Sequence, residues 1–316
     1  MKCKYLQFIL LTPILMLLFY GCEQSGLSPK EGFINVTGGR VWYKIVGKGN
    51  KTPLVLLHGG PGVPSYYLNP LAELSDERPV IFIDQLGCGR SDRITDTTLM
   101  TIDSYVKELQ EIKSSLGLKD FYLFGHSWGT MLAVEYYFDH PEGIKGLILC
   151  GPALDVHRWS KDADTLIAAL PDSIQSAINI NEKNGTYDSP GYQQAMDYYY
   201  KLYLARKQPW SADIDSAFSQ TGENVYMHMD GPSEFTLTGN LKNFNITGEL
   251  GRIKVPTLFM GGQYDEARPS TVRYYASLVP KSEVAIIPGA GHLCMQDNPD
   301  STNNAIRNFL DNLVRE

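Results

Sequence analysis

The chain has 316 residues, of which 43% are hydrophobic and 20% charged, so it is long enough to bury a sizeable core. Its formal net charge of −7 argues against a nucleic acid or an anionic lipid headgroup as a partner. The sequence contains no internal repeat, phosphate-binding loop or dinucleotide-binding motif, and its cysteine spacing matches neither a disulfide framework nor a zinc site. We therefore expect a globular domain that needs no metal and no cofactor.

The first residues are typical of a secretory signal. Two lysines precede an apolar stretch, Leu6–Tyr20, which is shorter than the roughly 20 residues that span a bilayer. This pattern, with a small residue before the cleavage point, predicts a signal peptide over residues 1–21. Gly21-Cys22 resembles the end of a bacterial lipobox, so we expect lipidation at Cys22. The polar residues 22–31 would then form a tether between the lipid and the domain, and the protein would be held at a membrane of the cell envelope. The alternative is a signal peptide that is cut elsewhere, with Cys22 an ordinary cysteine.

The domain should begin with a hairpin and a buried strand. Residues 33–46 are predicted to form an antiparallel hairpin with a turn at Gly38-Gly39. The apolar run Leu54–Leu57 leads directly into the glycine-rich sequence His58–Gly62. Glycines in such a loop let the backbone come close to a substrate carbonyl, so we expect the Gly60 amide to donate to an oxyanion. The alternative is a plain turn.

Strands and helices then alternate, which indicates a parallel sheet covered by helices. Residues 79–83 are strand-like, and the glycine-rich segment after them contains Arg90 and Asp92, which we expect to fold this loop rather than contact substrate. Apolar residues recur at helical spacing from Tyr105 to Leu116, and Gly117 ends the pattern.

The next strand-like run, Phe121–Phe124, is followed by Gly125-His126-Ser127-Trp128-Gly129 and by a predicted helix over residues 130–139. A serine in a G-x-S-x-G turn between a strand and a helix is held in a strained conformation with its hydroxyl exposed above the sheet. We therefore predict that Ser127 is a nucleophile and that the Trp128 amide is the second oxyanion donor. The alternative is a glycine-rich turn without a chemical role.

Between residues 155 and 249 the alternation of strands and helices is lost. This segment is helical in pattern and rich in tyrosine, which predicts a cap inserted after the sixth strand. It divides the core into residues 32–154 and residues 250–316. Most of its aromatic side chains should form the core of the cap, and one or two should wall an apolar pocket over Ser127.

Two later strand-like runs lead to a candidate acid and a candidate base. Residues 255–260 precede Asp265, and residues 284–287 precede His292. Since the carboxyl ends of parallel strands share one edge of a sheet, these loops can converge on Ser127. We predict that His292 exchanges a proton with Ser127 and that Asp265 orients the imidazole, with Asp155 as the alternative acid. Four further histidines are expected to be structural: His126, whose side chain should point away from Ser127, His140, His157 and His228.

These motifs together resemble one family, the proline iminopeptidases (prolyl aminopeptidases), which are α/β-hydrolase serine peptidases. The resemblance lies in the segments 58–62, 84–92 and 125–129, and it continues in Gly231-Pro232-Ser233-Glu234-Phe235 and Gly262-Gln263-Tyr264-Asp265-Glu266. It implies an α/β-hydrolase fold, with a mostly parallel eight-stranded sheet, helices on both faces and an inserted helical cap. It also implies that Glu234 and Glu266 bind the amino terminus of the substrate. One departure is Thr130, where the family more often has glycine.

The resemblance implies a serine aminopeptidase that releases an N-terminal residue, proline or another small residue, from short peptides through an acyl-enzyme. One alternative is a carboxylesterase or lactonase that has the same triad and no need for a free amine, and another is a non-catalytic binding protein on a hydrolase scaffold. Glu234 and Glu266 distinguish the aminopeptidase from the carboxylesterase or lactonase, because only a substrate with a free α-ammonium calls for buried carboxylates. Alternatively, Glu234 is a solvated residue of the cap, and Glu266 supports its neighbour Asp265.

Overall fold

The structure is a computed structural model, and it describes residues 27–315. The predicted signal peptide, the predicted lipidation at Cys22 and the start of the predicted tether lie outside the described residues. Within residues 27–315, the helices are all too short or too polar to cross a membrane.

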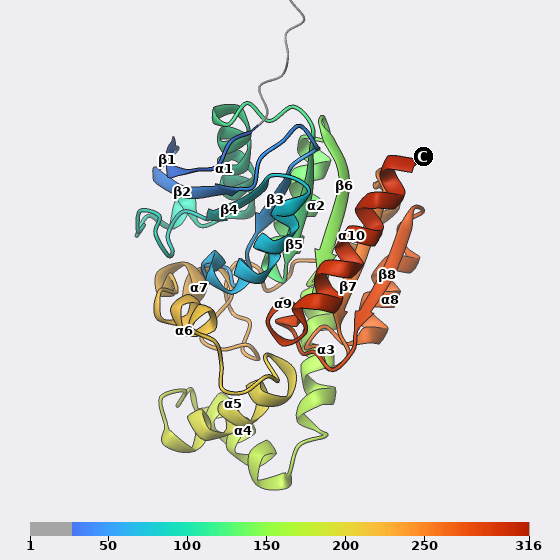
Figure 1. The fold of residues 1–316 in the computed structure, drawn as a ribbon. Helices are drawn as coiled ribbons and strands as arrows, with labels where there is room; N and C mark the ends of the chain where they lie inside the picture. The colour runs from blue at the N-terminus through green and yellow to red at the C-terminus, as the bar shows by residue number, and fades with distance from the viewer. Residues whose placement is uncertain (1–26, 316) are drawn as a thin grey trace, which may run out of the picture.

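An eight-stranded sheet forms the centre of the molecule (Figure 1), with the strand order β1-β2-β4-β3-β5-β6-β7-β8. The first hairpin pairs antiparallel, β2 also pairs antiparallel with β4, and every other neighbouring pair is parallel. The mostly parallel sheet is therefore the one that the sequence predicts. The strands are β1 Lys30–Val36, β2 Gly39–Val46, β3 Leu54–Leu57, β4 Val80–Asp84, β5 Phe121–His126, β6 Ile144–Cys150, β7 Thr257–Gly262 and β8 Ser282–Ile287.

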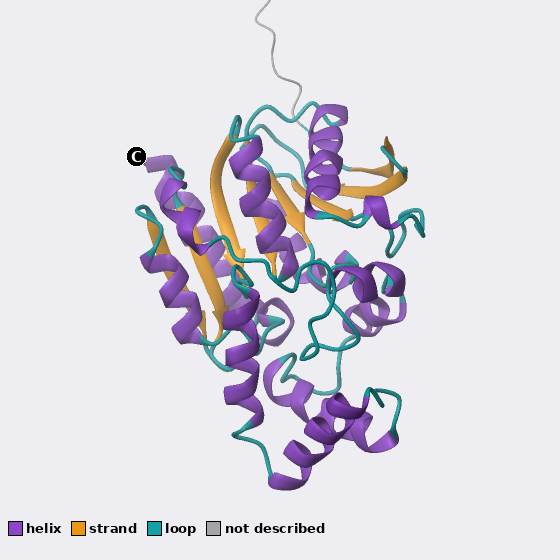
Figure 2. Cartoon of the chain, turned by 180° about the vertical axis from the view of Figure 1, so that it is seen from behind, coloured by secondary structure: helices purple, strands orange, loops and turns teal. Residues whose placement is uncertain are grey.

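Helices cover both faces of this sheet, as Figures 1 and 2 show from opposite sides. Along β3, Val55 and Leu57 pack into one apolar core with α1, α2 and α8, whereas Leu54 and Leu56 pack into a second core with η1, α9 and α10. Strands that are buried on both faces explain the continuous apolar runs in the sequence. These elements are η1 Ser65–Asp76, η2 Thr97–Leu99, α1 Ile102–Ser115, α2 Trp128–Asp139, α8 Pro269–Ser277, α9 Cys294–Asp297 and α10 Pro299–Arg315.

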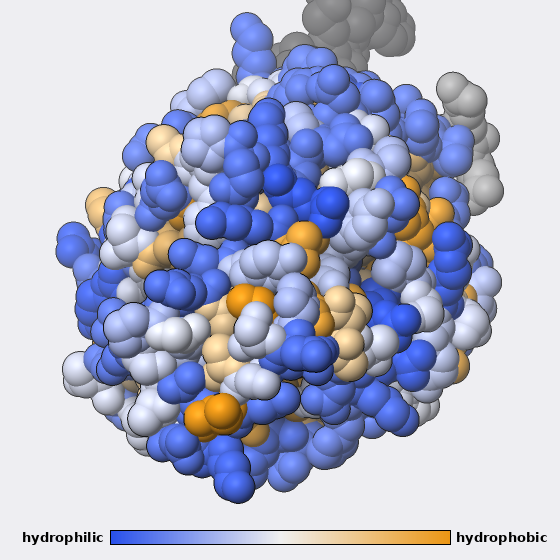
Figure 3. All heavy atoms as spheres, turned by 90° about the horizontal axis from the view of Figure 1, so that it is seen from below, coloured by the Kyte–Doolittle hydropathy of each residue, from blue (hydrophilic) through white to orange (hydrophobic). Residues whose placement is uncertain are grey.

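The segment between β6 and β7 carries the cap helices, which lie beside one end of the sheet (Figure 2). A separate small core within the cap contains Ile178, Ala195 and Tyr199, and Tyr199 also packs edge to face against Phe235. The outer face of this end is mostly polar with scattered apolar groups (Figure 3), and its helices expose Ile180 and Tyr198. The elements are α3 Val156–Ile167, α4 Asp172–Asn184, α5 Pro190–Tyr203, α6 Ala212–Ser219, α7 Glu223–Met229 and η3 Thr247–Arg252.

Several element boundaries differ from the sequence prediction by one to three residues, and two of these differences have a clear local cause. Strand β7 begins at Thr257 rather than Val255, and Pro256, which has no amide hydrogen to donate, precedes it. Helix α2 begins at Trp128, two residues earlier than predicted, because the chain turns directly from the nucleophile motif into the helix. All of these differences affect only the ends of elements.

Candidate active site

Ser127 lies on a sharp turn between β5 and α2, with φ 53° and ψ −121°. Among residues 27–315 it is the only residue other than glycine with a positive φ. The turn closes so tightly that a Cβ on Gly125 would lie 2.2 Å from the Gly129 carbonyl oxygen, and one on Gly129 would lie 2.4 Å from the Leu57 oxygen. Both glycines are therefore required sterically, and the strained serine is held where its hydroxyl can react.

His292 and Asp265 come together at the same edge of the sheet. The Nδ1 atom of His292 lies 2.7 Å from Oδ1 of Asp265, and the two side chains are 4% and 1% exposed. Asp265 also accepts hydrogen bonds from the amides of Gly262 and Ala267, which fix its carboxylate. Asp155, the alternative acid, instead caps the first turn of α3 by accepting from backbone amides there.

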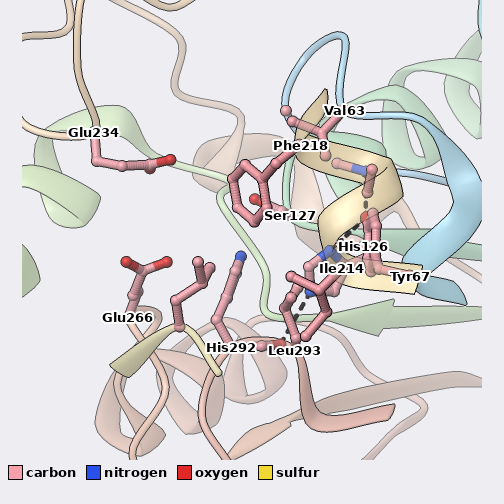
Figure 4. A pocket seen from close by; sticks show the side chains of 14 residues that line it. Val63, Tyr67, His126, Ser127, Ile214, Phe218, Glu234, Glu266, His292 and Leu293 are labelled. Carbon is pink, nitrogen blue, oxygen red and sulfur yellow. Dashed lines mark hydrogen bonds between the residues drawn. The ribbon is translucent and has the colours of Figure 1, made fainter. Parts of the chain in front are cut away.

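The charge around His292 favours its protonated form. Burial alone lowers the pKa of this imidazole, but the Asp265 carboxylate, with Glu266 and Glu234 nearby, raises the pKa to about 9. His292 is thus a strong proton acceptor when neutral, and its imidazolium is stabilised by Asp265. In Figure 4 the distal nitrogen of its ring points towards Ser127.

The loop between β3 and η1 lies beside Ser127. The Gly59 amide already donates to the Tyr67 hydroxyl at 2.6 Å, so it is not available to an oxyanion. The amides of Gly60 and Trp128 make no hydrogen bond to another protein group within residues 27–315, and both residues border the cavity that contains Ser127. Trp128 is the first residue of α2, where an amide has no partner inside the helix.

His126 was expected to point away from Ser127, but it lines the same cavity and packs against His292 with ring centroids 4.5 Å apart. Its Nδ1 atom lies 2.9 Å from the Tyr67 hydroxyl, and its Nε2 atom lies 3.0 Å from the His292 carbonyl oxygen. Because a carbonyl only accepts, Nε2 carries the proton and Nδ1 accepts from Tyr67. Burial, and then the nearby His292, hold the pKa of His126 well below its usual value, so a neutral ring connects the two loops that flank Ser127.

Two cavities meet at Ser127, and Gly60 and Glu234 border both. The first cavity has a volume of about 490 Å³ and contains His292 and Glu266 (Figure 4). The second cavity has a volume of about 360 Å³ and is lined by apolar side chains together with Ser127, Asp230 and Glu234. Its lining consists of Gly60, Pro61, Ser127, Trp128, Met131, Ala153, Val156, Trp159, Asp230, Glu234, Leu237 and Leu241.

Glu234 and Glu266 face the first cavity from different parts of the chain. Glu266 follows Asp265 and is only 3% exposed, and its Oε1 atom has no hydrogen-bond partner within the described residues. Glu234 lies in the loop after α7 and accepts a hydrogen bond of 3.1 Å from the Tyr226 hydroxyl. Burial raises the pKa of both carboxyl groups, and repulsion from Glu234 raises that of Glu266 further. An ammonium group bound between them would offset the loss of hydration and the repulsion between the two carboxylates.

The loop that carries Glu234 is held by the cap. Glu182 on α4 accepts hydrogen bonds from the hydroxyls of Ser233 and Thr236, the residues that bracket Glu234 and Phe235. The Ser233 hydroxyl in turn accepts from the amides of Phe235 and Thr236. The sequence analysis missed Glu182 because it lies 52 positions before Glu234 and carries no motif.

The described residues contain no group of three or more histidine, cysteine or acidic side chains that could hold a metal ion. Arg90 contacts the buried Asp84 carboxylate and stacks on Trp42, and Asp92 pairs with Arg40, so both of these polar residues hold the loop after β4.

Comparison with known proteins gives consistent matches over most of the chain. Residues 52–299 match the family model described as alpha/beta hydrolase fold. The chain is 42% identical to a proline iminopeptidase of Heyndrickxia coagulans, over 90% of this chain and 99% of the relative. Among solved structures, VinJ is similar with a TM-score of 0.87 and 31% identity (90% of this chain, 100% of VinJ). The proline iminopeptidase of Mycobacterium smegmatis is similar with a TM-score of 0.84 and 28% identity, over 90% of this chain and 98% of that one.

Proposed function

The chain belongs to the proline iminopeptidase family of α/β hydrolases, and we infer that it is a serine aminopeptidase that releases an N-terminal residue, proline or another small residue, from short peptides. The observation that carries this proposal is a pair of carboxylates, the buried Glu266 and the half-buried Glu234, that line the cavity at Ser127. Glu234 and Glu266 form no ion pair with a lysine, arginine or histidine of residues 27–315. A free α-ammonium of a substrate supplies the missing positive charge.

The chemistry follows from the atoms around Ser127. His292 takes the hydroxyl proton as the Ser127 oxygen bonds to the first peptide carbonyl, and Asp265 stabilises the imidazolium. The amides of Gly60 and Trp128 donate to the oxyanion, a contribution of about 3 kcal/mol for each such donor. His292 then gives its proton to the leaving amine, and the acyl-enzyme remains. A water molecule that loses its proton to His292 releases the amino acid and restores Ser127.

The ammonium contacts explain why an exopeptidase needs more than the triad. Charge-assisted hydrogen bonds contribute roughly 1.5–3 kcal/mol each, so Glu234 and Glu266 together favour a substrate with a free amino terminus. An N-acylated peptide carries no charge there and would leave the buried Glu266 and the half-buried Glu234 without a positive charge beside them. The second candidate function, a carboxylesterase or lactonase, uses the same triad but gives no reason for these carboxylates.

The test compares prolyl- and alanyl-4-nitroanilide with their N-acetylated counterparts and with a short acyl ester. We expect release from the free-amine compounds only, with the ratio of the two rates giving the preference for proline. Ser127→Ala should remove this activity and the labelling by a fluorophosphonate probe. Turnover of the ester without any preference for a free amine would instead support the esterase.

We also propose that the protein is exported and held at a membrane of the bacterial envelope by a lipid on Cys22. The support is the basic start, the short apolar stretch and the Gly21-Cys22 sequence. Mass spectrometry of the mature N-terminus tests this proposal, with a diacylated or triacylated Cys22 as the expected result. Cleavage at another bond, or an unmodified Cys22, would contradict it.

A further inference from the structure

The turn that carries His292 lies directly against the segment that follows the cap helix α5. The His292 amide donates to the Tyr203 carbonyl at 2.7 Å, and the Leu293 amide donates to the Leu204 carbonyl at 2.8 Å. The two segments are in close contact, because a Cβ on Gly291 would lie 2.6 Å from the Tyr203 oxygen. The backbone that carries the catalytic imidazole is therefore held partly by the cap.

Asp297, the last residue of α9, joins the same two segments through its side chain. Its Oδ2 atom accepts a hydrogen bond of 2.8 Å from the amide of Gly291, the residue before His292. Its Oδ1 atom accepts from the amides of Arg206 and Lys207, at 2.8 and 2.7 Å, in the segment that follows α5. The Arg206 amide also lies 3.0 Å from Oδ2. One carboxylate thus connects the His292 turn to the cap.

This connection requires a carboxylate. All three partners are backbone N–H donors, and an aspartate offers an acceptor at each of its two oxygens. An asparagine offers one oxygen and an NH2 group that only donates. Whichever way its amide is turned, the NH2 group would face either the Gly291 amide or the Lys207 amide. An asparagine at position 297 would therefore break the connection on one side.

Helix α9 is held in place independently of Asp297. The neighbouring Gln296 accepts from the Ser211 hydroxyl at 2.8 Å and donates to the Tyr67 carbonyl at 2.7 Å. Loss of the Asp297 contacts should therefore loosen the His292 turn without displacing the helix.

We propose that Asp297 is a positioning residue for the reaction: by binding the His292 turn to the cap, it sets where the imidazole lies relative to Ser127. Asp297 lines neither cavity and acts through the backbone of Gly291. This role applies to any substrate that Ser127 attacks, so it goes beyond the proposed aminopeptidase function and does not depend on recognition of an amino terminus.

Asp297→Asn tests this role with alanyl-4-nitroanilide and with a short acyl ester. A displacement of about 1 Å in a catalytic group can cost about 100-fold in rate, but His292 keeps its bond to Asp265, so we expect kcat to fall about tenfold for both substrates. KM should stay unchanged, because the residues that line the cavities are intact. Asp297→Glu keeps an acceptor at each oxygen and should recover part of the loss.

Asp155→Asn is the matched control, since it removes the same charge from another half-buried aspartate that binds backbone amides. Asp155 accepts from the amides of His157 and Arg158 with a single oxygen, Oδ1. An asparagine keeps that oxygen and caps a helix about equally well, so the kcat of this variant should equal that of the wild type.

Urea denaturation shows whether each variant is folded, and the rate of Ser127 labelling by a fluorophosphonate gives the same comparison without turnover. A folded Asp297→Asn protein with the kcat of the wild type, a loss confined to KM, or an equal loss in Asp155→Asn would overturn the role of Asp297. Failure of the proposed function is a separate result. Hydrolysis of the ester without the anilide would exclude the aminopeptidase, and the ester would still measure the effect of Asp297.

Discussion

Gly151 offers a sharp test of how the position of His292 governs activity. This glycine follows β6 and has φ +55°, and its amide donates to the Met260 carbonyl at 2.8 Å. A Cβ at this position would lie 2.6 Å from Cε1 and 2.7 Å from Nδ1 of His292. Because Nδ1 is the atom that meets Asp265, Gly151→Ala should push the imidazole away from its partner.

The size of the effect follows from the distances. Ordinary contacts of a Cβ begin at 3.4 Å, so the ring or the backbone must move by about 0.8 Å to admit the methyl group. A displacement of about 1 Å in a catalytic group can cost about 100-fold in rate. The left-handed backbone adds a stability cost of about 1–2 kcal/mol for alanine. We therefore expect kcat/KM for alanyl-4-nitroanilide to fall about 100-fold in a protein that is still folded.

Gly117→Ala is the matched control. Gly117 has φ +64° and no atom within 4 Å of an added Cβ, so this variant bears the backbone cost without a steric clash. Urea denaturation should show a similar loss of stability in both variants, while only Gly151→Ala loses activity and reacts slowly with a fluorophosphonate. Full activity in Gly151→Ala would refute the argument that this ring position controls the reaction.

Three further predictions concern the carboxylates and the loop after β4. Glu266→Gln should raise KM for alanyl-4-nitroanilide about tenfold and leave that for an acyl ester unchanged, and an equal effect on both would exclude ammonium binding. Since a raised pKa keeps His292 protonated to higher pH, kcat/KM should fall as the pH drops below about 9, and Glu266→Gln should move this fall to lower pH. A pH profile that is identical in both proteins would contradict the electrostatic explanation. Arg90→Met should cost about 3 kcal/mol in urea denaturation because it leaves the buried Asp84 unpaired, whereas Arg40→Met, at an exposed pair, should cost far less.

Much of the fold could be predicted because its signals are local. The strands carry continuous apolar runs, since both faces of the sheet are buried, and helix α1 carries apolar residues at helical spacing. The sharp turn at Ser127 could be predicted for the same reason: the close approaches of Gly125 and Gly129 impose glycine within two positions of it. The ends of the elements were predicted less accurately. Strand β7 begins at Thr257 rather than Val255, because the terminal residues of a strand depend on which amides find partners.

The sequence by itself determined which residues follow each strand end, and hence that Asp265 and His292 would lie at one edge of the sheet with Ser127. It favoured Asp265 over Asp155, which also follows a strand, but only the tertiary structure shows that Asp265 pairs with His292 and that Asp155 caps α3. Tyr67 and Glu182 were likewise invisible, since their partners His126 and Ser233 lie more than 50 positions away in the chain. The physical reason is that strand and turn patterns depend on neighbours in sequence, whereas the charge, shape and hydrogen bonds of the site depend on how the cap packs over the sheet.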